Sequence, residues 1–189
     1  MSDEVEFFFV PDADRQAAVF PTELGWMTCQ WSAGALERNA FGLRSFGAAR
    51  RTLTGEWKTL PPNEAEDGLL ALIERLRRFA REFADDFTDV PLSFAGISPF
   101  ARRALTACRQ IPLGTTITYA ELARRGGSPG AARAAGNTMA RNRFPLIVPC
   151  HRVVGAGGQL GGYSAPDGLV MKRRLLAAEA RTRGPHAAS

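Results

Sequence analysis

Apolar and polar positions follow two different periods in the first ninety residues, and each period predicts a type of element. Residues 7–10 and 26–31 are short apolar and aromatic runs that are typical of β-strands, and residues 40–46 are a third candidate. Beyond a proline-rich loop, apolar side chains recur at the three- and four-residue spacing of a single helix face over residues 69–83. The first half therefore predicts an α/β unit.

The second half predicts short helices that begin at capping residues and end at glycines. They are expected at about residues 98–109, 119–125, 128–140 and 168–180. The first begins at a serine followed by proline, and the second at a threonine followed three residues later by glutamate; both patterns cap helix N-termini. Gly126 and Gly127 separate the middle two. Two short helices joined by a glycine turn are typical of a helix-turn-helix, and residues 153–160 predict a hairpin-like wing.

Between these helices lies a segment that combines three chemically active side chains. The apolar run 144–148 predicts a short buried strand that Pro149 ends, and Cys150, His151 and Arg152 follow it. Reactive side chains often lie where the backbone leaves a strand. Successive side chains of an extended segment point to opposite faces, so we expect His151 to act on the sulfur through a water or across a turn. The alternative from these residues alone is a small buried cysteine beside a hydrogen-bonded histidine.

The recognition helix expected at 128–140 carries an unusual face. Its outward positions are almost free of side chains around a single arginine, Arg133; they are Gly130, Ala131, Ala132, Ala134, Ala135 and Gly136. A helix that reads major-groove base edges needs several long polar side chains. A smooth face with one arginine suits a narrow groove and close approach to the sugar-phosphate walls. The alternative is that alanines are simply good helix formers packed in a core.

Charge divides the chain near residue 90. Residues 1–90 carry ten Lys+Arg against sixteen Asp+Glu, a balance of −6, whereas residues 91–189 carry fourteen against three, a balance of +11. Arginine supplies nearly all of this positive charge, which suits phosphate and base-edge recognition. The second half is therefore expected to face a polyanion.

Length and composition place the chain among ordinary globular proteins of one or two domains. It has 189 residues, 45% of them hydrophobic, and no apolar run of membrane-spanning length. The first residues lack the basic start of a signal peptide, so we expect a cytoplasmic protein that does not bind membranes. Three cysteines and two histidines offer neither a disulfide framework nor a metal cluster, and we expect no cofactor. The expected boundaries are a domain at 1–90, a domain at 91–180 and a disordered tail at 181–189, with a linker at about 85–91.

Several motifs in the second half recur in the order and spacing of a known family. They are Ile111-Pro112-Leu113-Gly114, Thr118-Tyr119-Ala120-Glu121-Leu122-Ala123, Ala131-Ala132-Arg133-Ala134-Ala135-Gly136, Pro149-Cys150-His151-Arg152-Val153-Val154, Gly161-Gly162-Tyr163-Ser164 and Leu175-Leu176-Ala177-Ala178-Glu179. This set resembles the methylated-DNA–protein-cysteine methyltransferases, which repair guanine alkylated at O6. The resemblance implies an α/β fold with an N-terminal ribonuclease-H-like domain and a C-terminal, mostly helical, winged helix-turn-helix domain.

The same resemblance implies the reaction and its catalytic residues. A monomer would flip O6-alkylguanine out of double-stranded DNA and transfer the alkyl group irreversibly to Cys150, once per molecule and without a cofactor. His151 matches the water-linked base and Glu179 the carboxylate that orients it. Asn142 matches the asparagine that ties the recognition helix to the active-site segment.

The remaining matches lie on the DNA side. Arg133 matches the arginine that fills the space left by the flipped base, and Tyr119 the tyrosine that crowds the 3′ phosphate. The helix surface around Arg133 comes from Ala131, Ala132 and Gly136. The carbonyl oxygens of Cys150 and Val153, together with Ser164, match the contacts to the guanine edge, and Tyr163 matches the pocket wall.

One position departs from the family pattern, and two other classes of protein compete with it. The family usually has proline after the asparagine, whereas Asn142 is followed by Arg143, which implies a less rigid hinge and offers a phosphate contact. The first alternative is a winged-helix DNA-binding regulator without alkyl transfer, although the alanine-rich helix lacks base-reading side chains. The second is a cysteine hydrolase with a Cys/His/Glu triad. A non-catalytic alkyltransferase-like protein is excluded because Cys150 is present.

Overall fold

The computed structural model describes residues 4–11, 14–53 and 55–182, and the chain divides into two compact units. The first unit comprises Met1–Glu82 and Asp89–Ser93, and the second comprises Phe83–Thr88 and Phe94–Ser189. The chain therefore passes between the units three times. Within the described ranges, none of the helices combines the length and apolar character that a bilayer crossing requires.

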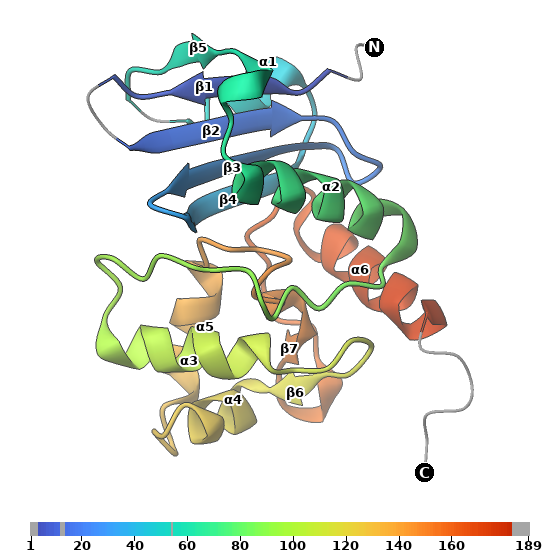
Figure 1. Cartoon of the computed structure of the whole chain (residues 1–189). Helices are drawn as coiled ribbons and strands as arrows, with labels where there is room; N and C mark the ends of the chain where they lie inside the picture. Colours follow the sequence, from blue (N-terminus) through green and yellow to red (C-terminus); the bar gives the residue numbers. More distant parts are fainter. Residues whose placement is uncertain (1–3, 12–13, 54, 183–189) are drawn as a thin grey trace. The chain divides into compact units, whose positions relative to one another are not determined.

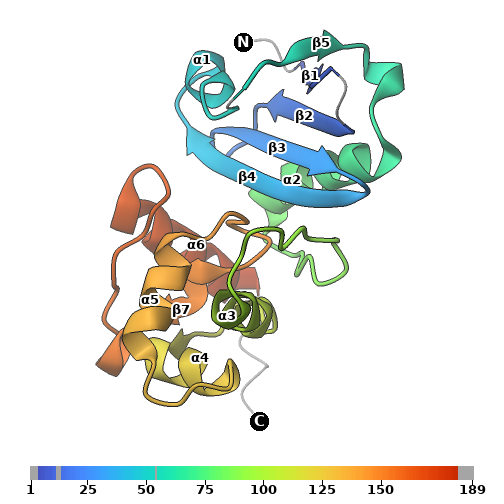
Figure 2. The same ribbon diagram turned by 90° about the vertical axis from the view of Figure 1, so that its left-hand side faces the viewer.

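The first unit is built on a five-stranded antiparallel sheet with the strand order β4-β3-β2-β1-β5 (Figure 1). Its elements are β1 (Glu6–Phe9), β2 (Arg15–Phe20), β3 (Trp26–Ser32), β4 (Ala35–Leu43), α1 (Phe46–Arg50), β5 (Lys58–Leu60), the 3-10 turn η1 (Pro62–Glu64) and α2 (Asp67–Glu82). Figure 2 shows the four strands β1–β4 from the side, with β2, β3 and β4 lying next to one another in this order.

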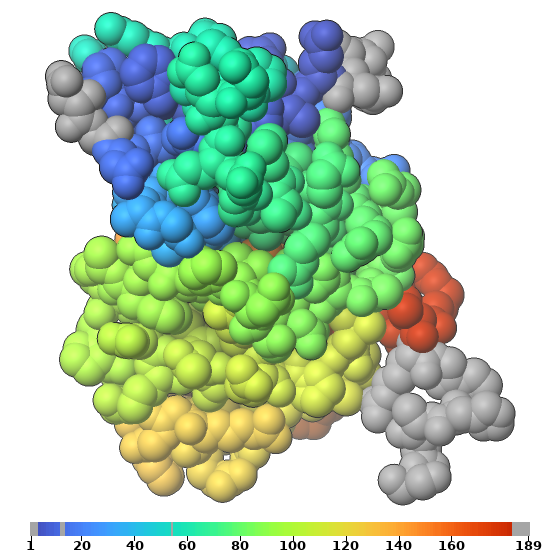
Figure 3. Space-filling model, viewed as in Figure 1, coloured from blue at the N-terminus to red at the C-terminus, as the bar shows by residue number. Residues whose placement is uncertain are grey.

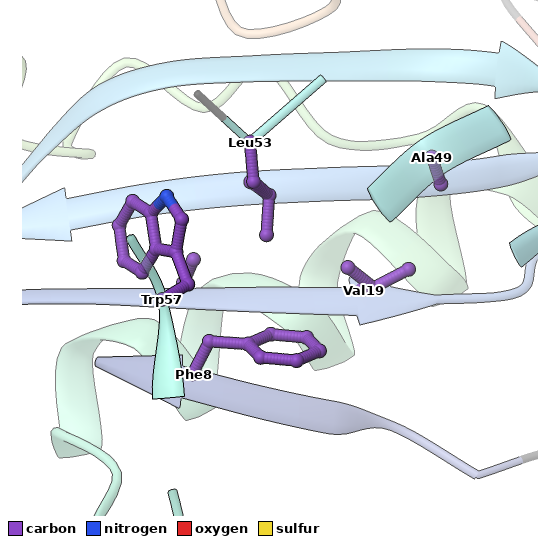
Figure 4. Close-up of a cluster of buried hydrophobic side chains, with 6 residues drawn as sticks. Phe8, Val19, Ala49, Leu53 and Trp57 are labelled. Carbon is purple, nitrogen blue, oxygen red and sulfur yellow. The ribbon is translucent and has the colours of Figure 1, made fainter. Parts of the chain in front are cut away.

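Both faces of this sheet are covered by apolar side chains. On the face next to α1, the buried cluster consists of Phe8, Ala17, Val19, Ala49, Leu53 and Trp57 (Figure 4). The buried side of α2 carries Leu69, Leu72, Ile73, Leu76, Phe79 and Ala80, and α2 contacts β3. The helix approaches so closely that a Cβ on Gly68 would lie 2.6 Å from the Trp31 ring. Burial on both faces fixes the strand register, because a one-residue slip would exchange the faces.

The expected α/β character of this half is confirmed, but the strands differ in detail. The runs at 7–10 and 26–31 form β1 and β3, and the helix predicted over 69–83 is α2. The third strand is displaced: β4 ends at Leu43 because Ser45 caps α1 by accepting a hydrogen bond from the Ala48 N–H. The prediction missed β2 and β5. The helix ends at Glu82 because Phe83 adopts a positive φ of 53°.

The second unit consists of helices around a two-stranded parallel sheet. Its elements are α3 (Pro99–Arg109), β6 (Ile117–Thr118), α4 (Tyr119–Arg125), α5 (Ala132–Ala140), the 3-10 turn η2 (Cys150–Arg152), β7 (Val153–Val154), η3 (Ala156–Gly158) and α6 (Gly168–Thr182). Helices α3, α4 and α5 contact one another, and β6 pairs with β7. The turn between α4 and α5 lies at the surface of this unit (Figure 3).

The first two helices of this unit begin where the capping patterns predict. Ser98 Oγ accepts from the Ala101 N–H at 3.3 Å, and Thr118 Oγ1 accepts from the Glu121 N–H at 3.1 Å. The Glu121 carboxylate does not return to the helix N-terminus. It pairs instead with Arg124 and Arg125 at 2.8 and 2.7 Å, so only half of the capping box forms.

The start predicted for the third helix is wrong. Helix α5 begins at Ala132 rather than near residue 128, and Ala131 at its N-cap provides no side-chain hydrogen bond. Gly130 has a φ of +85°, and the Ala131 N–H donates to the Ser128 carbonyl, so these residues form a turn instead of the first helical turn. Within α5, Ala135 is fully buried and does not belong to the outward face on which it was expected.

The strand predicted at 144–148 and the hairpin-like wing at 153–160 are also wrong. The residues of the first segment are buried, but Leu146 has a φ of +72° and the Val148 N–H donates to the Phe144 carbonyl at 2.7 Å, which closes a turn. In the second segment, β7 pairs in parallel with β6 rather than with a following strand. The Gly155 N–H donates to the Gln159 carbonyl at 2.7 Å, so the chain closes a tight loop around η3.

Helix α6 extends two residues beyond the predicted end, to Thr182, so residues 181 and 182 are helical rather than part of a tail. The remainder of the predicted tail, residues 183–189, lies outside the described residues. Of three successive cations on this helix, Lys172 is fully buried, whereas Arg173 and Arg174 are exposed.

Candidate active site

Cys150 lies at the first position of η2, and only 4% of its surface is exposed. Pro149 sets the turn, because its carbonyl accepts from the Arg152 N–H at 2.8 Å. Cys150 and His151 therefore lie in a 3-10 turn and not in the extended segment that the sequence suggested. The turn places a thiol, an imidazole and a guanidinium at three successive buried positions.

The His151 ring is fully buried and bonds to Glu179 of α6, with Nε2 2.8 Å from Oε1. Burial lowers the pKa of His151, although the Glu179 carboxylate opposes this shift. The imidazole is therefore neutral near neutral pH and donates its Nε2 proton to the carboxylate. Its Nδ1 is buried without a hydrogen-bond partner among the described residues. A neutral ring in this tautomer presents Nδ1 as a proton acceptor.

Arg152 fixes the Glu179 carboxylate from a second side. Its Nε and Nη2 donate to the two carboxylate oxygens at 2.9 and 2.8 Å, and its Nη1 donates to the Ile111 carbonyl at 2.7 Å. Burial raises the pKa of Glu179, but the hydrogen bonds and charges of His151 and Arg152 outweigh burial and lower it to about 2. Glu179 thus stays ionised and cannot rotate. The role of Arg152 cannot be read from its adjacency to His151, because the carboxylate that the two residues share lies 27 residues away.

Asn142 joins the end of α5 to the active-site loop. Its side-chain N–H donates to the Val148 carbonyl at 2.8 Å, and its carbonyl oxygen accepts from the Phe144 N–H at 2.9 Å. It also hydrogen-bonds Cys150 and thereby opposes the rise in the pKa of the thiol. The asparagine therefore acts on both the backbone and the sulfur of the loop.

Lys172 is a second buried cation of this site. Its ammonium donates to the Val153 carbonyl at 2.6 Å, and its positive charge lowers the pKa of Cys150. Val153 is itself fully buried, and its carbonyl is one of the groups expected at the guanine edge. A lysine three residues before Leu175 on an amphipathic helix falls on the buried side, and this periodicity is the signal that could have identified it.

Two tyrosines border the thiol. Burial and the nearby Cys150 raise the pKa of Tyr163, whose ring also meets the His151 ring edge-on at 6.5 Å. Burial followed by the charge of Cys150 raises the pKa of Tyr119, which places this residue near the same sulfur. The Tyr119 hydroxyl lies against Gly161, where a Cβ would approach it to 3.0 Å. Ser164 follows Tyr163 but is exposed.

The outward face of α5 differs from this buried cluster. The Arg133 side chain is exposed and makes no hydrogen bond or ion pair with any residue that the structure describes. Ala131, Ala132 and Gly136 are partly exposed near it. A Cβ on Gly136 would lie 3.8 Å from the Tyr119 ring. The smooth helix face and Tyr119 are therefore adjacent, whereas Arg124 and Arg125 are already paired with Glu121.

The three thiols differ in their surroundings. Burial raises the pKa of Cys29 and of Cys108 well above the ordinary range. Burial also raises the pKa of Cys150, but Asn142, Lys172 and backbone N–H groups all act to lower it. Hydrogen bonds and positive charge favour a thiolate. Of the three, Cys150 is the thiol for which an adjacent neutral imidazole can take up the proton. Among the described residues, no three His, Cys, Asp or Glu side chains gather in a way that could hold a metal ion.

Comparisons with known proteins converge on one family. Residues 99–181 match the family described as 6-O-methylguanine DNA methyltransferase, DNA binding domain. The chain is 43% identical over 128 residues to a methylated-DNA–protein-cysteine methyltransferase of Methanopyrus kandleri, covering 68% of this chain and 92% of that protein. It is 41% identical over 108 residues to a protein of the same name from Methanothermobacter thermautotrophicus, covering 57% of this chain and 59% of that protein. This second match therefore spans about three fifths of the length of the Methanothermobacter thermautotrophicus protein.

The fold has solved counterparts as well. The Mycobacterium tuberculosis O6-methylguanine methyltransferase aligns with a TM-score of 0.68 at 31% identity, covering 89% of this chain and 93% of that one. A structure of the Mycobacterium tuberculosis OGT in complex with DNA aligns with a TM-score of 0.65 at 29% identity, covering 88% and 93%. The likeness therefore extends over both units and not only over the matched second half.

Proposed function

Because the chain belongs to the methylated-DNA–protein-cysteine methyltransferases, we propose that it removes the alkyl group from O6-alkylguanine in double-stranded DNA and keeps it on Cys150. In this transfer the sulfur attacks the alkyl carbon, the carbon–oxygen bond breaks and guanine leaves. The product is a thioether, which ordinary water and thiols do not reverse. One molecule therefore repairs one lesion.

The observation that carries the proposal is the chain of groups that runs from Glu179 through His151 toward Cys150. Glu179, held by Arg152, accepts the Nε2 proton of His151 at 2.8 Å and leaves Nδ1 as the acceptor. A thiol with an ordinary pKa near 8.5 is only a few per cent thiolate at neutral pH, and burial lowers that fraction further. A base is therefore needed, and Nδ1 would take the thiol proton through an intervening water.

The sulfur must then reach a base that normally lies inside the duplex. Flipping the nucleotide costs a few kcal/mol, which contacts with the protein must offset. We propose that Arg133, exposed on the smooth face of α5, occupies the vacated space and that Tyr119 crowds the adjacent phosphate. The Val153 carbonyl, held by Lys172, would accept from the guanine edge together with the Cys150 carbonyl and Ser164, beside Tyr163. Ala131, Ala132 and Gly136 would allow the backbone to approach.

Several finer features belong to the same proposal. We take α4 and α5 as a helix-turn-helix, supported by their contact and short connecting turn. The sheet with α2 packed on it supports a ribonuclease-H-like assignment for the first unit. The groups assigned to chemistry all come from one unit of one chain, which supports a monomer. The same proposal includes a cytoplasmic location.

Mass spectrometry of the intact protein tests this function. The protein is mixed with a duplex that contains one O6-methylguanine, and its peptides are then mapped. The expected result is one methyl group per molecule, located on Cys150. Methyl on Cys29 or Cys108 would contradict the assignment. A protein that binds the duplex but stays unmodified would instead favour the alternative of a winged-helix regulator.

A further inference from the structure

Arg143 occupies the position directly after Asn142, and its side chain reaches a distant part of the second unit. Its guanidinium Nη2 donates to the Ala95 carbonyl at 2.8 Å. Ala95 belongs to a turn in which the Ile97 N–H donates to the Phe94 carbonyl at 3.0 Å. This turn directly precedes α3. The hydrogen bond therefore fastens the segment after α5 to the segment before α3.

Phe144, the residue after Arg143, packs against the same turn. The fully buried Phe144 ring packs edge-on against Phe94, with the centroids 6.0 Å apart. The Arg102 guanidinium of α3 also lies 5.3 Å from the centroid of the Phe94 ring. The turn at 94–97 is thus contacted both by α3 and by residues 143 and 144. It is a fixed support rather than a free loop.

Asn142, the residue before Arg143, contacts the active-site loop that carries Cys150. Asn142 donates to the Val148 carbonyl and hydrogen-bonds Cys150, so its orientation sets part of the environment of the sulfur. Two consecutive residues therefore have complementary partners: Asn142 faces the active-site loop, and Arg143 faces the turn. A movement of the backbone at Arg143 would be transmitted to the Asn142 amide one residue away.

We propose that Arg143 is a positioning residue for the transfer reaction: its hydrogen bond to Ala95 fixes the hinge that orients Asn142 toward Cys150. This inference rests on the proposed function. Arginine does not restrict its own φ, so the constraint on the hinge comes from the distant end of its side chain. The Arg143 N–H makes no hydrogen bond with any residue that the structure describes. A proline at this position would therefore fix φ, and so constrain the hinge, without the loss of a backbone hydrogen bond.

The test compares three variants on a substrate that needs no flipping. Arg143→Ala removes the clamp, Arg143→Pro replaces it with a local backbone constraint, and Arg141→Ala removes a neighbouring exposed arginine as the matched control. The rate of Cys150 alkylation by free O6-benzylguanine is measured from pH 6 to pH 10. A single hydrogen bond corresponds to a loss of about three- to tenfold for Arg143→Ala.

The pH profile separates positioning from general destabilisation. Loosening of the Asn142 hydrogen bond would raise the pKa of Cys150, so the rate profile of Arg143→Ala should shift to higher pH. Arg143→Pro should restore both the rate and the profile, and Arg141→Ala should change neither. Duplex and free-base rates of Arg143→Ala should fall by the same factor, because flipping is unaffected.

Other outcomes overturn the inference. If Arg143→Ala reacts normally with the free base but binds duplex more weakly and with a smaller salt dependence, the arginine is a phosphate contact. If Arg143→Pro unfolds at the wild-type temperature yet reacts as slowly as Arg143→Ala, the constraint on the hinge does not explain the loss of rate. A wild-type protein that never alkylates Cys150 would instead contradict the proposed function, which distinguishes the two failures.

Discussion

The interior of the active-site turn and the outward face of α5 lie in the same unit but are built in opposite ways. In the interior, His151, Arg152, Lys172 and Glu179 are almost fully buried, and each has a partner within 3 Å. On α5, the Arg133 side chain is exposed and makes no hydrogen bond or ion pair with the described residues. The interior can set a protonation state, because low dielectric strengthens each interaction. The helix face retains a free cation for a partner that is not part of the chain.

This difference assigns separate steps to the two regions. Groups with fixed partners hold the thiol, the base and the carboxylate in one arrangement before any substrate arrives, which is what proton transfer requires. An unpaired arginine on a small-residue face has no task inside the protein, and it can enter the base stack only if nothing else holds it. We therefore propose that the chemistry takes place in the interior and that the exposed helix face supports flipping.

The largest expected effect is the loss of the acceptor. Cys150→Ser should abolish transfer to both duplex and free-base substrates, because a serine hydroxyl in the same buried position is far harder to deprotonate than a thiol. Duplex binding should remain, since the exposed arginines are unchanged. Cys108→Ser is the matched control, because Cys108 is also a buried thiol of this unit. Residual methyl transfer by Cys150→Ser, measured by mass spectrometry, would contradict the acceptor assignment.

A smaller effect is expected for the orienting carboxylate. Glu179→Gln should slow alkylation by free O6-benzylguanine by about 10²–10⁴, the usual contribution of a positioned base. It also leaves the Arg152 charge buried without its partner, and the loss of a buried partner typically costs about 3–5 kcal/mol. The rate must therefore be measured well below the thermal midpoint of the variant, which unfolding experiments supply. A stable variant with a normal free-base rate would show that His151 does not need Glu179.

Arg133→Ala should have a smaller effect, and only on duplex. A few kcal/mol of flipping energy shared among several contacts corresponds to a loss of about ten- to a hundredfold in the duplex rate. Alkylation by the free base should continue at the normal rate, because no nucleotide must leave a stack. Arg124→Ala is a suitable control, since its guanidinium is paired with Glu121. Equal losses on both substrates would mean that Arg133 supports the pocket.

The smallest effect is a pH dependence of stability. Burial lowers the pKa of His151, so below its ordinary value of about 6.5 the unfolded chain binds a proton that the folded protein does not. The free energy of unfolding should therefore fall as pH drops from about 6.5 to 5, before carboxylates such as Glu179 begin to titrate in the unfolded chain. The other histidine, His186, lies outside the described residues. Denaturant titrations of the wild type and of His151→Gln check this prediction. If the free energy of unfolding of the wild type stays constant between pH 6.5 and 5, the prediction is wrong.

Local sequence signals predicted part of this molecule well. Ser98 and Thr118 define the starts of α3 and α4, because a capping hydrogen bond is formed by residues three positions apart. The resemblance grouped His151 with Glu179, and the structure brings these two side chains together at 2.8 Å. The strand β2 was missed because its Arg-Gln-Ala-Ala segment has no marked β-preference and forms a strand only between its neighbours.

What the sequence did not predict depends on tertiary contacts. The apolar run at 144–148 has the composition of a strand, yet Leu146 adopts a left-handed conformation because the loop must turn to bring Cys150 under Asn142. Arg152 and Lys172 look like surface cations in a basic half. The burial of Arg152 follows from Glu179, a partner 27 residues away that no local pattern reveals. The partner of Lys172 is the Val153 carbonyl, 19 residues away, and only the helical spacing of the lysine from Leu175 indicates that it is buried.

The most direct test of the division between interior chemistry and surface flipping is the Arg133→Ala/Glu179→Gln double variant. Repair rates on duplex are measured under single-turnover conditions for the wild type, both single variants and the double variant. If one residue acts on flipping and the other on chemistry, the two losses in activation free energy should add to within about 0.5 kcal/mol. A coupling above about 1 kcal/mol would contradict the account, because it would mean that the two residues act on the same step.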